Sequence, residues 1–446
     1  MSITLDEALA SLDGLEDLGA VETLEQAGEV QRHVNLAQAE LLKIACHWAD
    51  LNAVLDSPVN TTIPGTERLV RLGGEGTPEV AEFATAELGA QLSMSAGGCA
   101  IVIADALDLR HRLPLLWALV CAGDIKPYVA RQVAQKTRQL SQTAAAVVDA
   151  KAARYAPTLP WGRLEPVVDA AILAADPEQA KAEIEAARDR QGVWVGRDAD
   201  HGYQKVFIRA GGPDVKAFDT AIEDIAAALE LLGDPDTLDL RRAKAVGVIA
   251  STQATLDLFT AAAQRADGAD GNSPVTPYQP TTTGAATVYV HLAAEAVAGR
   301  FGVARVEDLG PALCEQLTEL LGARAITVKP VIDLNDNRSV DGYEVPDWLD
   351  EEVHLRGPAD CFPHSANTRR GGDSDHTKPY EPPGDGGPPG QTTLANLGKL
   401  FRFQHRVKTH GRWKVVQLRC GVWLWRSPHG FCYLVDGTGT THLGRI

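Results

Sequence analysis

Residues 373–410 hold the side chains whose types and spacing could do chemistry. An acid and an imidazole stand together at Asp375-His376, followed by Asn396 and then by His405. In metal-assisted cleavage of a phosphodiester, a carboxylate and an imidazole hold a hard divalent cation while a second imidazole activates water. The pattern therefore predicts a metal site for this chemistry. Asn396 would serve either as a ligand or as the residue that pins the loop carrying His376.

The same stretch resembles the HNH endonuclease motif, which is built on a ββα-metal fold. The tail, residues 411–428, looks like that of one family, in which a long helical domain of unknown function (number 222) precedes a C-terminal HNH module. Residues 76–83 and 328–334 also look familial, so the resemblance covers most of the chain. It implies a metal-dependent endonuclease that cleaves double-stranded DNA.

The resemblance also implies roles for individual residues. His376, near the end of the first strand, would be the general base that deprotonates the attacking water. Asp375 and His405 would bind the metal, with His405 on the helix. Asn396, just before that helix or at its start, would be a third ligand or an orienting residue. Asp373 would support one of the metal ligands without binding the metal itself. The expected cofactor is one hard cation, Mg²⁺ or Mn²⁺.

Structural zinc is a feature of many relatives, bound by cysteines that flank this core. Ser365, Phe401 and Gln404 stand at those places here. Cys361 alone cannot supply the four ligands that structural zinc needs. We therefore expect no structural zinc. A hydrophobic core is expected in its place, from Phe362, Phe401 and Phe403.

The charge distribution is uneven. The net charge of −17 disfavours binding to phosphate, yet residues 386–435 contain no carboxylate and many basic residues. One interpretation is that these are ordinary solvated surface charges. Their coincidence with the Asp-His…Asn…His pattern favours contact with nucleic acid instead. The residues predicted to make that contact are Arg402, Arg406, Lys408, Arg412 and Lys414.

The predicted helices and strands indicate an α+β fold. Several domains are expected, because 446 residues are too many for a single hydrophobic core. We expect a helical domain over residues 1–265 with a β-hairpin inserted near 193–208. A linker over 266–284 and a small α/β segment over 285–355 come next. The module over 356–446 would end in a β-meander that Trp413, Trp423 and Trp425 pack onto the nuclease core.

Helices are predicted from apolar spacing and capping residues. Thr77-Pro78-Glu79 should open one, with Thr as the N-cap. Further helices are expected near residues 93–113, 124–140, 141–153, 161–174, 177–190, 214–232, 237–265 and 308–321. Strands are expected at 287–292 and 325–331. In the hairpin turn, Asp198, Asp200 and His201 fit turn chemistry better than a metal loop.

The first long helix, over residues 30–55, carries apolar residues at alternating steps of four and three. They are Val30, Val34, Ala37, Leu41, Ile44, Trp48, Leu51 and Leu55. Such a seam can pack within the domain or against a second copy of the chain as a homodimer. Because the heptad run is short for a free coiled coil, intrachain packing is the favoured interpretation.

The remaining features bound the class of protein. Seven scattered cysteines without a C-x-x-C pair argue against a disulfide framework or a zinc finger. No apolar run is long enough for a membrane span, and the acidic start lacks the regions of a signal peptide, so a cytoplasmic location without membrane attachment is expected. Two alternatives to the DNA endonuclease stay open. One is a non-catalytic DNA- or partner-binding protein with a vestigial HNH module, and the other is RNA cleavage by the same residues.

Overall fold

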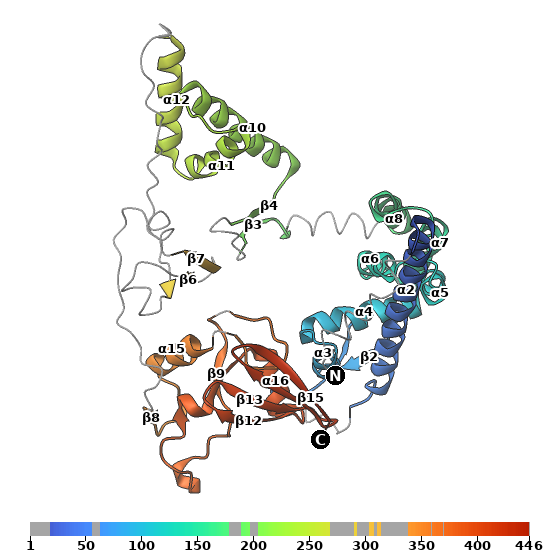
Figure 1. The fold of residues 1–446 in the computed structure, drawn as a ribbon, viewed down its shortest axis with the longest axis vertical. Helices are drawn as coiled ribbons and strands as arrows, with labels where there is room; N and C mark the ends of the chain where they lie inside the picture. Colours follow the sequence, from blue (N-terminus) through green and yellow to red (C-terminus); the bar gives the residue numbers. More distant parts are fainter. Residues whose placement is uncertain are drawn as a thin grey trace. The chain divides into compact units, whose positions relative to one another are not determined.

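The computed structural model describes residues 18–55, 63–177, 189–196, 204–267, 290–291, 303–306, 310–313, 338–357, 359–368 and 370–445. The chain folds into many helices and several small antiparallel sheets (Figure 1). It divides into two units. One joins Met1–Ala180 to Pro330–Ile446, and the other is Lys181–Lys329.

The N-terminal part of the first unit is a bundle of short helices behind one long one. Ser95 and Ser141 cap two of the helices, each accepting a hydrogen bond from the backbone N–H three residues on. Pro114 and Pro127 occupy the first helical position of two others, where no N–H is needed. The helices are α2 (Ala20–Leu51), α3 (Ala84–Gln91), α4 (Ala96–Arg112), α5 (Pro114–Ala122), α6 (Pro127–Thr137), α7 (Gln142–Tyr155) and α8 (Trp161–Ala175).

The prediction of a helix that starts at Thr77 is wrong. Residues Glu79–Ala81 form strand β2, which pairs with β1 (Leu69–Arg71), and α3 begins only at Ala84. The Thr77 hydroxyl donates to the Gly74 carbonyl in the preceding turn instead of capping a helix. Pairing with the neighbouring strand of the same hairpin has overridden the capping signal at Thr77.

Helix α2 buries a different face from the one expected to pack within the chain. The buried side chains are Asn35, Ala39, Leu42, Ala45, Cys46 and Ala49. On the predicted seam, Val30, Val34, Leu41, Ile44 and Leu51 are exposed by 43–65% of their surface. Only Trp48 and Leu55, at the end of the seam, pack against the core. Small residues let α2 lie close to α4 and α5, so the favoured interpretation of the seam was wrong for most of its length.

The second unit contains a hairpin, three helices and a small sheet. Strands β3 (Gly192–Val195) and β4 (Val206–Arg209) pair as predicted, while the turn with Asp198, Asp200 and His201 lies outside the described residues. Helix α10 is Gly212–Leu231. The single helix expected over 237–265 is two, α11 (Leu238–Ile249) and α12 (Thr252–Asp267), because the chain turns at Ser251, whose hydroxyl accepts from the Ala254 N–H.

A three-stranded sheet of the second unit corrects another prediction. Its strands are β5 (Val290–His291), β6 (Val303–Val306) and β7 (Gly310–Leu313). Strand β7 falls where a helix over 308–321 was expected, and antiparallel pairing with β6 explains the difference. Most of the predicted linker, the strand at 325–331 and most of the helix at 177–190 lie outside the described residues.

The C-terminal part of the first unit holds the predicted site. It contains β8 (Ser339–Val340), α15 (Asp347–Arg356), β9 (Asp373–His376), β10 (Thr392–Thr393), the short 3₁₀ helix η2 (Leu394–Asn396), β11 (Leu397–Leu400) and α16 (Arg402–His410). The predicted β-meander follows and is confirmed, with a fourth strand that was not expected. Its strands are β12 (Lys414–Arg419), β13 (Val422–Arg426), β14 (Phe431–Asp436) and β15 (Gly439–Arg445).

One buried cluster joins the two parts of the first unit. Trp413, Trp423 and Trp425 pack the meander as predicted, with 0–6% of their surface exposed. Phe83, from the segment before α3, lies in the same cluster, and its ring meets Phe403 edge to face. Phe362 is buried there and Phe403 lies at the edge, whereas Phe401 is not part of the cluster. The C-terminal part therefore completes its core with residues from the N-terminal bundle.

The boundaries of the two units differ from the predicted domain boundaries. The boundary expected at 265/266 falls inside the second unit, and residues 1–180 and 330–446 belong together. In the described part of the chain, no single helix is both long and apolar enough to cross a membrane. Helices α3 and α4 meet that test only as a pair bent by 100°.

Candidate active site

Two strands and a helix position the predicted catalytic residues. Strand β9 carries Asp373, Asp375 and His376, and it pairs antiparallel with β11 so that His376 lies opposite Leu397 and Asp375 opposite Gly398. Helix α16 begins two residues after β11 ends and places His405 one turn in. His376 ends its strand and His405 sits on the helix, as expected. Asn396 does not lie at the start of the helix but immediately before β11.

Asp373, His405 and Asp375 form a line across the strand and the helix. Nδ1 of His405 lies 3.2 Å from the Asp373 carboxylate, and Nε2 lies 3.6 Å from Oδ1 of Asp375. Because a carboxylate can only accept, Nδ1–H is the donor to Asp373. Nε2 then either carries a proton shared with Asp375 or offers its lone pair to a cation.

His376 is held in one tautomer by Thr392. The Thr392 hydroxyl donates to the Gly342 carbonyl over 2.5 Å, which uses its only proton. The same oxygen lies 2.8 Å from Nε2 of His376 and must therefore accept a hydrogen bond from that nitrogen. With its proton on Nε2, the neutral imidazole carries its basic lone pair on Nδ1. This is the form that a general base requires.

Burial keeps His376 in its neutral form. Only 4% of the residue is exposed, and the Tyr343 ring stacks on the imidazole at 5.5 Å between centroids. This desolvation lowers the pKa of His376 below its ordinary value of 6.5; the nearby Lys408 ammonium acts in the same direction, and the Asp375 carboxylate opposes them. At neutral pH the side chain can accept a proton.

Asn396 uses its side-chain amide to hold the loop that follows His376. Its Oδ1 accepts from the Lys378 N–H at 2.8 Å, and its Nδ2 donates to the carbonyls of Lys378 and Gln391 at 3.2 and 3.0 Å. Its own carbonyl accepts from the Thr377 N–H at 2.7 Å. Both atoms of the side-chain amide are therefore engaged in pinning the ends of the loop that follows His376.

A cavity of about 440 Å³ collects the other predicted residues in one place. Its lining includes Asp373, Asp375, His376, Arg402 and His405. Tyr343 and Glu344 close it from the segment after β8. Spacing and the resemblance to the HNH motif predict that Asp373, Asp375, His376 and His405 lie together, and the fold places them in a single pocket. Asn396 is not among its lining residues, which agrees with its orienting role.

A divalent cation fits the donor pair in this pocket. Oδ1 of Asp375 and Nε2 of His405 lie 3.6 Å apart, and a divalent cation could bind both atoms in place of a proton on Nε2. The other oxygen of Asp375 is engaged, because Lys408 Nζ lies 2.5 Å from Oδ2. Within the described ranges, no group of three or more His, Cys, Asp or Glu side chains is arranged to hold a metal ion. Water and substrate oxygens would have to complete the coordination.

The five predicted nucleic-acid contacts divide into three kinds. Arg402 is 84% exposed at the mouth of the pocket, and Arg412 and Lys414 are exposed farther along the chain. Lys408 is only 13% exposed, and its ammonium also donates to the His376 carbonyl. The prediction for Arg406 requires correction, because its guanidinium is committed to the N-terminal part of the unit.

The partners of Arg406 explain that correction. Nη1 and Nη2 bind both oxygens of Glu82 at 2.8 and 2.7 Å, and Nε donates to the Gly65 carbonyl at 3.0 Å. A planar guanidinium bound to both oxygens of a carboxylate is a strong, oriented pair. Arg406 therefore joins α16 to the segment that leads into α3, and it is not available to a phosphate.

Thr392 and Tyr343 are the site residues that sequence reasoning missed. Neither lies in the motif, and each contacts His376 only because β10 pairs with β8. No spacing signal identifies them. A Thr in a two-residue strand and a Tyr in a loop become recognisable only when the sheet is formed.

The comparisons with known proteins concern the long N-terminal part. Residues 57–345 match the family model described as "Domain of unknown function (DUF222)". No curated protein and no solved structure matches the chain. Since residues 57–345 make up more than half of the 446 residues, the chain belongs to the DUF222 family.

Proposed function

We propose that this protein is a metal-dependent DNA endonuclease of the HNH type, with its active site in the pocket lined by β9, α16 and the segment after β8. The observation that carries the proposal is the state of His376. It is buried, neutral and held with its Nδ1 lone pair unprotonated, in the same cavity as Asp375 and His405. A carboxylate, an imidazole ligand and a separate imidazole base are the groups that hydrolysis of a phosphodiester needs.

Each residue has one task in this proposal. His376 takes a proton at Nδ1 from the attacking water, and Thr392 keeps the other ring nitrogen protonated. Asp375 and His405 hold the cation, and Asp373 orients the His405 ring through Nδ1–H. Arg402, exposed at the pocket mouth, can contact a phosphate of the substrate.

The cation, Mg²⁺ or Mn²⁺, would supply positive charge to the phosphate and to the leaving oxygen when it is bound. The Lys408 ammonium pairs with Oδ2 of Asp375, whereas Oδ1 of the same carboxylate faces His405. The ammonium compensates the negative charge of Asp375 and fixes the orientation of the carboxylate relative to β9. The backbone carbonyl of His376 accepts from the same ammonium, so Lys408 ties the ligand and the base to one helix.

One alternative has an observation in its favour. The Lys408–Asp375 ion pair occupies an oxygen that a metal could otherwise use, and no three-residue metal group is found in the described part of the chain. A non-catalytic DNA- or partner-binding protein that retains the HNH framework would show the same features. The enzyme is favoured because the neutral His376 shares its cavity with the Asp375 and His405 side chains that could bind a cation.

The decisive experiment is cleavage of supercoiled plasmid with Mg²⁺ or Mn²⁺. The wild type would be compared with His376→Ala and, as a matched control, with His47→Ala, which removes an exposed imidazole on α2. Conversion to open-circle or linear DNA by the wild type and the control, but not by His376→Ala, would support the proposal. Equal cutting by all three proteins would refute it.

Cation binding provides an independent measurement. Titration calorimetry with Mn²⁺ should show one site in the wild type and in His376→Ala, and its loss in Asp375→Asn and His405→Ala. If the wild type binds no cation and cuts no plasmid, the non-catalytic alternative is favoured. Competition between duplex DNA and RNA in the cleavage assay separates the DNA enzyme from an RNA-cleaving one.

A further inference from the structure

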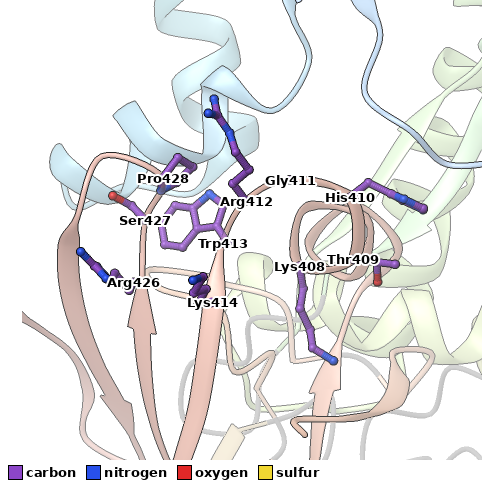
Figure 2. A pocket seen from close by; sticks show the side chains of 10 residues that line it. All are labelled: Lys408, Thr409, His410, Gly411, Arg412, Trp413, Lys414, Arg426, Ser427 and Pro428. Carbon is purple, nitrogen blue, oxygen red and sulfur yellow. The ribbon is translucent and has the colours of Figure 1, made fainter. Parts of the chain in front are cut away.

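A second hollow in the first unit is basic rather than acidic. It has a volume of about 560 Å³ and lies where the end of α16 meets the first two strands of the meander (Figure 2). We call it the basic hollow. It is lined by Lys408, Thr409, His410, Gly411, Arg412, Trp413, Lys414, Arg426, Ser427 and Pro428. Four of these residues are Lys or Arg and none is acidic, on a chain whose net charge is −17.

Two of the basic residues are placed directly against each other. Lys414 on β12 and Arg426 on β13 are cross-strand partners, so their side chains project from the same face of the sheet. Figure 2 shows them on adjacent strands, with Lys408 on the neighbouring helix. Both side chains are exposed, so one anion bound beside the sheet can contact two positive charges.

The floor of the basic hollow is rigid. Trp413 is 5% exposed and packs against the rings of Phe362 and Trp425 in the core that joins the meander to α3. Ser427 is buried, and its N–H and hydroxyl are tied to Phe431 across the turn between β13 and β14. A rigid floor holds the exposed cations at fixed positions, which favours recognition of a regular array of charges.

The basic hollow is connected to the candidate active site through one residue. Lys408 lines the hollow, and its ammonium contacts Asp375 and the backbone of His376. Helix α16 therefore contributes to both hollows, with His405 in the acidic pocket and Lys408 in the basic hollow.

We infer that the basic hollow binds the backbone phosphates of duplex DNA next to the scissile one, with Lys414 and Arg426 as the main contacts. This inference rests on the proposed function for the identity of the substrate. Arg426 was not among the residues predicted from the sequence, and its role follows only from the strand register. Contacts to phosphate are independent of base sequence, so the hollow would set affinity and position rather than target choice.

The test is the salt dependence of DNA binding by the full-length chain. A fluorescent duplex of random sequence is titrated in EDTA at several KCl concentrations, with the wild type and with Lys414→Gln/Arg426→Gln. Each lost phosphate contact lowers the salt slope by about 0.9, so the double variant should lose a slope of about 2 and bind at least about tenfold more weakly. The matched control is Arg71→Gln/Arg419→Gln, which removes two exposed positive charges at other positions.

The possible results separate this inference from the proposed function. A normal slope in the Lys414/Arg426 variant, or an equal loss in the control, would overturn the inference even if the plasmid is cut. A selective loss with no plasmid cleavage by the wild type would support the hollow while the endonuclease proposal fails. A selective loss with single-stranded RNA but not with duplex DNA would also overturn it.

Discussion

The lock on the tautomer of His376 can be tested by changing Thr392 to Val, which keeps the shape of the side chain and removes the hydroxyl. In the wild type that hydroxyl accepts from Nε2–H of His376 at 2.8 Å and donates to the Gly342 carbonyl at 2.5 Å. Thr392 is completely buried, so no water replaces the lost bonds without rearrangement. Thr392 acts on the reaction through His376 and is a positioning residue.

The magnitude follows from the two bonds. A buried donor left without a partner costs about 1–3 kcal/mol, and the folded state should lose about that much stability. The same hydrogen bond favours the tautomer with its proton on Nε2. Losing about 1.4 kcal/mol of that preference lowers the ratio of the Nε2–H tautomer to the Nδ1–H tautomer by about tenfold. We therefore expect cleavage to slow by up to about tenfold, beyond any effect of unfolding.

Three measurements check this reasoning. Denaturation in urea gives the change in the free energy of unfolding, and plasmid cleavage at saturating Mg²⁺ gives the rate. Nitrogen-15 NMR of histidine-labelled protein reports which ring nitrogen of His376 carries the proton. A substitution that only lowers stability would leave that proton on Nε2. Thr392→Ser should restore the rate because it keeps the hydroxyl. Thr393→Val, whose hydroxyl bonds only to the Arg338 carbonyl, is the matched control.

Two results would refute the tautomer lock. One is wild-type cleavage by Thr392→Val in a folded protein. The other is a wild-type NMR spectrum with the proton of His376 on Nδ1, because the hydrogen bond to Thr392 would then run against the derived direction.

Three further predictions concern other parts of the first unit. A double-mutant cycle with Arg406→Met and Glu82→Gln should give a coupling energy of about 1–3 kcal/mol in urea denaturation, with little change in the salt slope of DNA binding; a coupling near zero would contradict the joint between α16 and the N-terminal part. The exposed seam of α2 predicts a homodimer of twice 47.6 kDa that pairs through this helix, and Leu41→Glu/Ile44→Glu should convert it to a monomer in light scattering. A wild type that is already monomeric, or a dimer that the change does not affect, would refute pairing through α2. Burial lowers the pKa of His376, so as the pH falls below 6.5 the unfolded chain protonates this imidazole before the folded protein does. The wild type should therefore lose more stability on acidification than His376→Gln. An equal loss would count against a buried neutral imidazole.

Residue types and spacing were sufficient to group the acidic and imidazole side chains of the candidate site. The order of Asp375, His376 and His405 predicted one pocket, and the cavity that contains all three agrees with it. Local signals also predicted the meander, since alternating apolar residues and glycine turns are properties of short segments. Gly421 and Gly430, at two of its turns, have positive φ angles of 79° and 89°, as a tight turn requires.

Contacts between distant segments decided the rest. Thr392 reaches His376, and Arg406 reaches Glu82, through pairings that span 16 and 324 positions of the chain. The exposed seam of α2 shows the same limit, because its heptad spacing is visible in the sequence but the face that meets α4 and α5 is not. Spacing reports which residues can share a face of one element. Only packing between elements determines which face is buried, which charge is committed to a partner and which remains available to a substrate.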